Sequence, residues 1–451
     1  MVTVVNRTPR AAYVVASVAL TLGLCGLGMQ AASAEVLPDS SGTSAAPDAP
    51  VSPITLKSAD YEVDSTKLIV TFEASGNDVA TDEAIAITLD GKLIETVPLD
   101  EGAVKSYERT YTVAGPRTLT LGLTGTWKSG DESLSEKLWS KTVQVPATPK
   151  PTTTRISGAD RYEAAVNVSK AAYPETAPVV YVVTGANYPD ALSAGPAAAN
   201  EGGPLLLTTT ESLLPAVAAE IKRLQPDKIV VVGGPNSVSP KVLSTLEGLQ
   251  SNTVRISGAD RYEASQNLAK YAFGTTGAAT AYVATGANFP DALSAGAAAA
   301  STDGPVVLIN GDATAPDAAT LALLNDLEVE TVKIAGGPAS VSLGVEAGLA
   351  NDDRSVARFG GADRFEASAT INADAFASST EAFLVTGLKF PDALSGSAWA
   401  GAINAPLYVT LPDCVPSETL AAMRAQGVTE VTLIGGPASL SQKVLDLTSC
   451  D

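Results

Sequence analysis

The chain has 451 residues, 45% of them hydrophobic, and carries a formal net charge of −20. This composition supports ordinary globular cores and excludes wholesale disorder, and the length predicts about three domains. So acidic a chain is a poor candidate for nucleic-acid binding, which needs clustered cations. The chain contains no histidine, which excludes Ser-His-Asp and Cys-His catalysis and nearly every catalytic zinc site.

The first 34 residues have the pattern of a secretory signal peptide. Arg7 and Arg10 form a positive n-region, residues 11–27 are apolar, and residues 32–34 (Ala-Ser-Ala) form a small-residue cleavage site. A membrane span is the alternative, but it needs about 20 uninterrupted apolar residues. We therefore expect residues 1–34 to be removed and the secreted chain to have no membrane segment.

The next segments predict a small β domain between two linkers. Residues 35–54 are rich in Pro, Ser and Ala and predict a flexible leader, and residues 147–154 predict a Pro/Thr-rich linker. Between them, residues 55–146 alternate apolar and polar side chains, and Asp90-Gly91 is typical of a hairpin turn. The pattern predicts an all-β sandwich, immunoglobulin-like in the loose sense. It contains no motif for chemistry, so we expect a spacer or a module that binds a protein partner.

From Arg155 onward, three motifs recur three times in the same order. RISGADRYEA occurs identically at 155–164 and 255–264, and RFGGADRFEA stands at 358–367. A TGxx[YF]PDALS motif and a GGPxSxS motif follow in each copy. A period near 100 residues is long enough for each repeat to be a domain. The predicted repeats span 155–254, 255–357 and 358–451.

Each repeat alternates strands and helices. In the first copy, the apolar runs and turn residues predict strands at 153–156, 178–183, 205–208 and 228–232 and helices at 160–172, from 190, at 213–225 and at 240–249. Apolar strands that alternate with helices are typical of a parallel sheet covered on both faces. The sequence therefore predicts three tandem open α/β modules.

All three motifs occupy turns between a strand and a helix, at the edge where open parallel sheets bind ligands. We expect them to converge on one edge of each module or on a junction between modules. The aspartate of the PD pair, at 190, 291 and 392, could instead cap its helix. GADR[YF]E contains an arginine, at 161, 261 and 364. Because it repeats in an acidic region, it is a candidate for binding an anion. Asn187 and Asn288 could hydrogen-bond a sugar, and Lys389 replaces them in the third copy.

The helices that follow the PD pair are rich in alanine. Their sequences DALSAGPAAAN and DALSAGAAAAS carry little bulk, so each helix could approach a neighbouring repeat or pack tightly on its own sheet. The sequence leaves both alternatives open.

Two cysteines remain after the signal peptide. Cys414 and Cys450 allow one intramolecular pairing, which an oxidising exterior permits, and two free thiols are the alternative.

At the three repeated motifs the sequence resembles the cell wall-binding repeat 2 family of Gram-positive surface proteins and some of their autolysins. The resemblance implies three toprim-like or flavodoxin-like modules about a pseudo-threefold axis and non-covalent attachment to an anionic secondary wall polymer. It also implies that an apolar strand near the module interface belongs to the binding region. The candidate polymer-binding residues are thus Arg161, Arg261, Arg364, Asn187, Asn288, Lys389, Asp190, Asp291, Asp392, Leu205, Leu206, Val306, Val307, Leu407 and Tyr408.

The predicted function is a secreted, non-catalytic wall-binding protein that displays its β domain. An acidic chain meets a polyanion with like-charge repulsion, so binding needs local cationic pockets or bridging divalent ions. No catalytic residue, protein metal site or cofactor is predicted. The alternatives are an adhesion or partner-binding protein whose β domain is the effector and, less favoured, a peptidoglycan-active hydrolase using a carboxylate pair. The sequence contains no G-x-G-x-x-G or P-loop motif that would support nucleotide binding.

Overall fold

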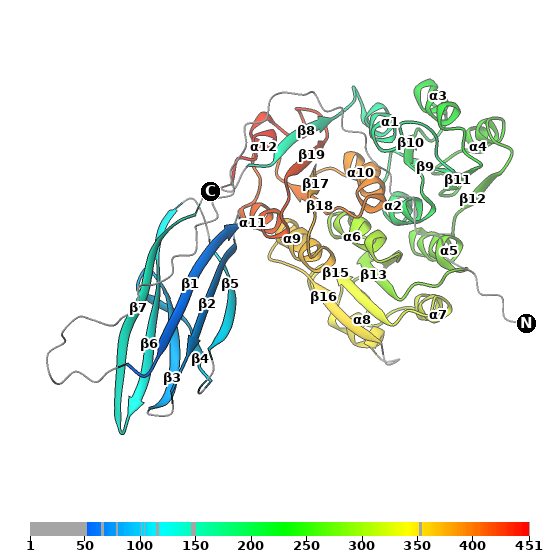
Figure 1. Cartoon of the computed structure of the whole chain (residues 1–451). Helices are drawn as coiled ribbons and strands as arrows, with labels where there is room; N and C mark the ends of the chain where they lie inside the picture. Colours follow the sequence, from blue (N-terminus) through cyan, green and yellow to red (C-terminus); the bar gives the residue numbers. More distant parts are fainter. Residues whose placement is uncertain are drawn as a thin grey trace, which may run out of the picture. The chain divides into compact units, whose positions relative to one another are not determined.

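The computed structural model describes residues 52–64, 67–77, 80–100, 102, 104–113, 117–145, 150–350 and 354–450. The predicted signal peptide and residues 35–51 of the predicted leader lie outside this range, as do residues 147–149 of the linker. The chain divides into two compact units, Met1–Pro149 and Lys150–Asp451 (Figure 1).

The first unit is a sandwich of two antiparallel sheets with strand orders β1-β2-β5 and β4-β3-β6-β7. Alternate apolar side chains of both sheets, such as Val70 on β2 and Leu121 on β6, share one buried core. Asp90 and Gly91 have positive φ in the β3–β4 turn, as the predicted hairpin requires. The predicted immunoglobulin-like sandwich is therefore confirmed. The strands are β1 (Thr55–Asp64), β2 (Lys67–Ser75), β3 (Thr81–Leu89), β4 (Lys92–Pro98), β5 (Lys105–Thr112), β6 (Arg117–Ser129) and β7 (Glu132–Val145).

The second unit contains three α/β modules with parallel sheets, as predicted. In each module the strand that follows the first helix lies between the next two strands of the chain, as β9 does in the order β10-β9-β11-β12. This order is that of flavodoxin-like sheets, whose ligand site lies where the strand order reverses. The first module contains α1 (Arg161–Ala172), β9 (Val179–Thr184), α2 (Pro189–Glu201), β10 (Leu205–Thr208), α3 (Pro215–Leu224), β11 (Lys228–Val232) and α4 (Pro240–Glu247).

The other two modules repeat this succession. The second contains α5 (Arg261–Phe273), β13 (Thr280–Thr285), α6 (Pro290–Ser301), β14 (Val306–Ile309), α7 (Ala318–Asp326), β15 (Thr331–Ala335) and α8 (Leu343–Leu349). The third contains α9 (Arg364–Ala375), β17 (Glu381–Thr386), α10 (Pro391–Ala402), β18 (Leu407–Thr410), α11 (Ser417–Gln426), β19 (Glu430–Ile434) and α12 (Gln442–Leu445).

In each α/β module, the fourth strand of the parallel sheet comes from the start of another repeat. β12 (Thr253–Ile256) opens the second repeat but pairs with β11, and β16 (Ser355–Phe359) opens the third repeat but pairs with β15. β8 (Thr152–Ile156), which begins inside the predicted linker, pairs with β19 of the third module. Each module thus completes its predecessor, and β8 closes the three into a ring with a pseudo-threefold axis.

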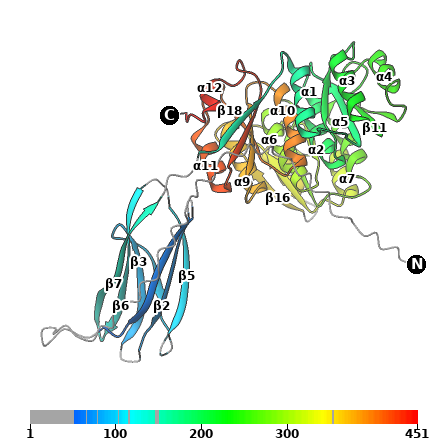
Figure 2. The same ribbon diagram turned by 45° about the horizontal axis from the view of Figure 1, so that its top comes forward.

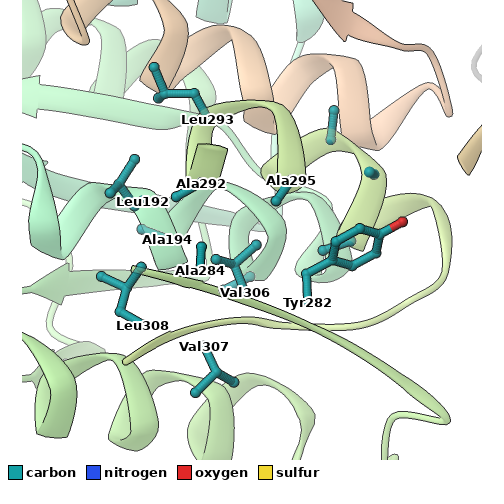
Figure 3. Close-up of a cluster of buried hydrophobic side chains, with 14 of the residues drawn as sticks. Leu192, Ala194, Tyr282, Ala284, Ala292, Leu293, Ala295, Val306, Val307 and Leu308 are labelled. Atoms are coloured by element: carbon teal, nitrogen blue, oxygen red, sulfur yellow. The ribbon is translucent and has the colours of Figure 1, made fainter. Parts of the chain in front are cut away.

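The alanine-rich helices α2, α6 and α10 pack against one another at the centre of this ring (Figure 2). A Cβ atom at Gly401 of α10 would lie 2.4 Å from the Cβ of Ala300 on α6. Leu192 and Ala194 of α2 lie beside Ala292 of α6 and Val306 of β14, so one buried core crosses the module boundaries (Figure 3). The small side chains therefore serve the packing of the three repeats on each other.

Two further features complete the unit. Cys414, after β18, and Cys450, at the C-terminal end, form a disulfide. Among the helices that the structure describes, none is both long and apolar enough to cross a membrane.

Candidate functional site

The loops that follow the three central strands meet at the pseudo-threefold axis. Their aromatic residues, Tyr188, Phe289 and Phe390, form a triangle with ring centroids 5.5, 5.6 and 5.8 Å apart. The Tyr188 hydroxyl also donates to the carbonyl oxygen of Ala287 at 2.7 Å. The three copies of TGxx[YF]PD thus converge on a junction between modules, one of the two arrangements that the sequence predicted.

The residue before each aromatic is exposed at this junction, namely Asn187, Asn288 and Lys389. Asn187 Oδ1 accepts from the backbone N–H of Tyr188 at 2.9 Å, which leaves its amide N–H groups available. Lys389 has no hydrogen-bond or ion-pair partner within the described ranges. We call the three aromatics and these three residues the axis face.

Each repeated arginine donates to the loop of its own module. Arg161, Arg261 and Arg364 reach the carbonyl oxygens of Gly185, Gly286 and Gly387 at 2.6, 2.6 and 2.7 Å. The Arg161 guanidinium carbon lies 5.8 Å from the ring centroid of Phe390, and that of Arg261 lies 5.9 Å from the ring centroid of Tyr188. These arginines hold the loops and line the axis face.

The aspartates of the PD pairs do not cap their helices. Asp190 lies in the first turn of α2, whose N-cap is Tyr188 without a side-chain hydrogen bond. Its carboxylate instead packs on the GGPxSxS loop, where a Cβ atom at Gly233 would lie 2.4 Å from Asp190 Oδ2. Gly233 has a φ of +115°, which favours glycine. The alternative that Asp190 caps its helix is wrong, because its carboxylate packs on the neighbouring loop.

Burial raises the pKa of all three of these carboxyl groups. For Asp190, a hydrogen bond with Ser237 and the charge of Arg261 oppose the effect of burial. In the same way, Asp291 interacts with Arg364 of the next module, and Asp392 with Arg161 of the first. Each of these carboxyl groups therefore lies within the electrostatic influence of an arginine from a neighbouring module.

A second set of arginines was not predicted from the sequence. Arg255 on β12 donates to the carbonyl oxygens of Gly233 and Val238 at 2.7 Å, in the loop of the preceding module. Arg155 reaches Gly435 at 2.7 Å, and Arg358 reaches Gly336 at 3.0 Å. These residues open the repeated R[IF]xGADR motif, but their role depends on the strand exchange, which the sequence pattern does not record.

The apolar strand residues proposed for polymer binding are buried. They lie in the sheets with relative exposures of 0–1%, so burial excludes direct contact with a polymer in this arrangement. Tyr408, the polar member of the set, donates its hydroxyl to Gln426 Oε1 at 2.6 Å. The set comprises Leu205, Leu206, Val306, Val307, Leu407 and Tyr408. A strand inside a doubly covered sheet needs apolar side chains for its own core.

The described part of the chain holds no group of three or more His, Cys, Asp or Glu residues placed to bind a metal ion.

Comparisons with known proteins agree with this architecture. Two curated proteins of Bacillus subtilis (strain 168) are similar: N-acetylmuramoyl-L-alanine amidase LytC, 28% identical over 64% of this chain and 56% of its own, and Amidase enhancer, 30% identical over 65% and 39%. The chain thus spans about half or less of the length of these relatives.

Two solved structures share the fold. Cwp6 from Clostridium difficile has a TM-score of 0.61 at 21% identity and matches 88% of this chain and 68% of its own. Cwp8 from Clostridium difficile has a TM-score of 0.60 at 19% identity and matches 85% and 88%.

The family comparison matches all three repeats. The model of cell wall binding domain 2 (CWB2) matches residues 155–243, 255–346 and 358–445. Three tandem matches over more than half of the chain, in the modules that form the ring, show that the protein belongs to the CWB2 family and is a cell wall-binding protein.

Proposed function

We propose that the chain is a secreted, non-catalytic surface anchor. Its three modules bind an anionic secondary wall polymer non-covalently through the axis face, and the β-sandwich unit is displayed on the cell. The observation that carries this proposal is the convergence of three copies of one motif on a single exposed junction.

The chemistry of the axis face suits a charged saccharide. The amide of Asn187 and its counterpart in Asn288 can hydrogen-bond hydroxyl groups, and the aromatic edges offer apolar contact. Lys389 supplies a cation. In a chain of net charge −20, such a local cation offsets the general repulsion of a polyanion.

The absence of catalysis is part of the proposal. The chain has no histidine, and no repeated motif places two carboxylates as a general acid and base. The acidic residues that the repeats share have structural partners instead: Asp160 Oδ1 accepts from the N–H of Tyr162 at 2.9 Å, and Glu163 accepts from Ala159 at 2.7 Å.

The second candidate function is adhesion or partner binding by the β-sandwich unit. Leu93 and Ile94 lie on β4, an edge strand of its sheet, and are 57% and 42% exposed, so they offer apolar surface to a partner. This role is compatible with wall anchoring. It predicts that Leu93→Ser with Ile94→Ser reduces adhesion of intact cells without releasing the protein from walls.

Sedimentation with purified walls tests the anchoring function. The secreted chain should pellet with untreated walls and remain in solution after acid has stripped the secondary polymers. A chain that lacks residues 150–451 should remain in solution with both. Pelleting that survives stripping would identify peptidoglycan as the ligand, and no pelleting with untreated walls would refute anchoring.

A further inference from the structure

The axis face combines three loops, but it is not threefold symmetric in chemistry. The first two loops read Ala-Asn before the aromatic, at 186–187 and 287–288, whereas the third reads Leu388-Lys389. Leu388 is 51% exposed. The third loop therefore presents an apolar side chain and a cation where the others present a methyl group and an amide.

The three loops also form one continuous patch. Neighbouring aromatic centroids are less than 6 Å apart, and the hydroxyl of Tyr188 binds the backbone of the second loop. A saccharide seated on one loop consequently covers the other two. Three polymer strands cannot occupy the three loops independently.

Lys389 differs from the arginines of this patch in having no hydrogen bond within the described residues. Each arginine donates a hydrogen bond to a glycine carbonyl oxygen of its own module and acts through its charge on an aspartate of a neighbouring module. Lys389 acts on Asp392 only through its charge. A compact ammonium group with free donors suits a single anionic substituent.

Resting on the anchoring function above, we infer that each chain binds one polymer segment across its three modules, with one anionic group of that segment at Lys389. Asn187 and Asn288 contact uncharged saccharide on either side. Lys389 thus determines the specificity for a charged polymer and fixes its direction on the ring.

Binding of a defined probe to the whole secreted chain tests this inference. The probe is the size-fractionated anionic polymer that mild acid releases from the walls. Native mass spectrometry should show one fragment per chain. Lys389→Asn, which copies the residue of the other two loops, should weaken binding about 10-fold because a charge-assisted contact is lost. Lys443→Asn removes the same charge from exposed α12 and should leave the affinity unchanged.

A transplanted lysine provides the rescue. Because the loops are related by the pseudo-threefold axis, Asn187→Lys added to Lys389→Asn should restore most of the affinity. Synthetic glycerol-phosphate and galacturonate oligomers then distinguish a phosphate from a carboxylate as the anionic group.

The outcomes separate this inference from the proposed function. If the unmodified chain does not pellet with walls, the anchoring function itself fails. If it pellets, but three fragments bind per chain or Lys389→Asn binds as tightly as Lys443→Asn, anchoring stands and the single-site inference is overturned.

Discussion

At the scale of single residues, the buried carboxyl group of Asp291 predicts that stability depends on pH. Burial raises the pKa of Asp291 above its ordinary value despite Ser340 and Arg364. The folded chain then holds this proton more tightly than the unfolded chain. The resulting stabilisation is fully present below the ordinary pKa and is lost as pH rises through the raised pKa.

Asp291→Asn removes this titration. We expect the melting temperature of the variant, minus that of the unmodified chain, to increase as pH rises from about 4 to about 7. Taking the difference cancels the carboxyl groups that both chains share. Asp312→Asn changes an exposed aspartate in the same module and provides the control. A difference that does not vary with pH would show that burial of Asp291 has no linked proton.

At the scale of elements, the central helices depend on glycine for their close approach. A Cβ atom at Gly401 of α10 would lie 2.4 Å from the Cβ of Ala300 and 3.2 Å from that of Ala199. Alanine favours an isolated helix over glycine by about 1 kcal/mol, but overpacking a core costs about 1–3 kcal/mol. We expect Gly401→Ala to destabilise the α/β unit by about 1–2 kcal/mol.

Denaturant unfolding measures this effect, and Ala300→Gly supplies the matched partner. Ala300→Gly has its own cost of about 1 kcal/mol in helix α6, so both single variants are measured, and the double variant should be less destabilised than the sum of the two because it removes the nearer methyl group. Additive effects of the two substitutions would mean that the Gly401–Ala300 contact is not the cause.

The positions of the helices and strands were easier to predict from the sequence than the pairing of the strands. The predicted helix at 160–172 and strand at 178–183 correspond to α1 and β9, because apolar runs and turn residues are local signals. The pairing of β8 with β19 joins residues almost 280 positions apart, and no local pattern encodes it. The burial of Leu206 on β10 follows from helices covering both faces of its sheet. The apolar sequence of β10 is compatible with a buried core strand and equally with a polymer-binding strand, so it could not distinguish the two.

At the scale of the whole molecule, the ring has one closure that differs from its other two interfaces. Ser193 meets Ser265 at 2.8 Å between the first and second modules, and Ser294 meets Ser368 at 2.8 Å between the second and third. At the closure, α10 packs against α1, and Ala165 of α1 occupies the position that corresponds to Ser265 and Ser368.

The missing serine also means that β10, an edge strand, lacks one hydrogen bond that the corresponding strands β14 and β18 have. Ser265 accepts from the backbone N–H of Leu308 at 2.9 Å, and Ser368 accepts from that of Val409 at 3.1 Å. Ala165 cannot do this for β10. In addition, β12 and β16 follow directly in the chain from the module they complete, whereas β8 is joined to its sheet only by non-covalent contacts. The closure should therefore open more readily than the other interfaces.

Native-state hydrogen exchange tests this expectation within one molecule. The amides of β8 should exchange faster than those of β12 and β16, which occupy the same position in the other sheets. Ala165→Ser should restore a hydrogen bond worth about 1 kcal/mol and slow the exchange of β8 about 5-fold, leaving β12 and β16 unchanged. Equal protection of the three strands would mean that the pairing of β8 with β19 alone holds the ring as firmly as the serine pairs do elsewhere.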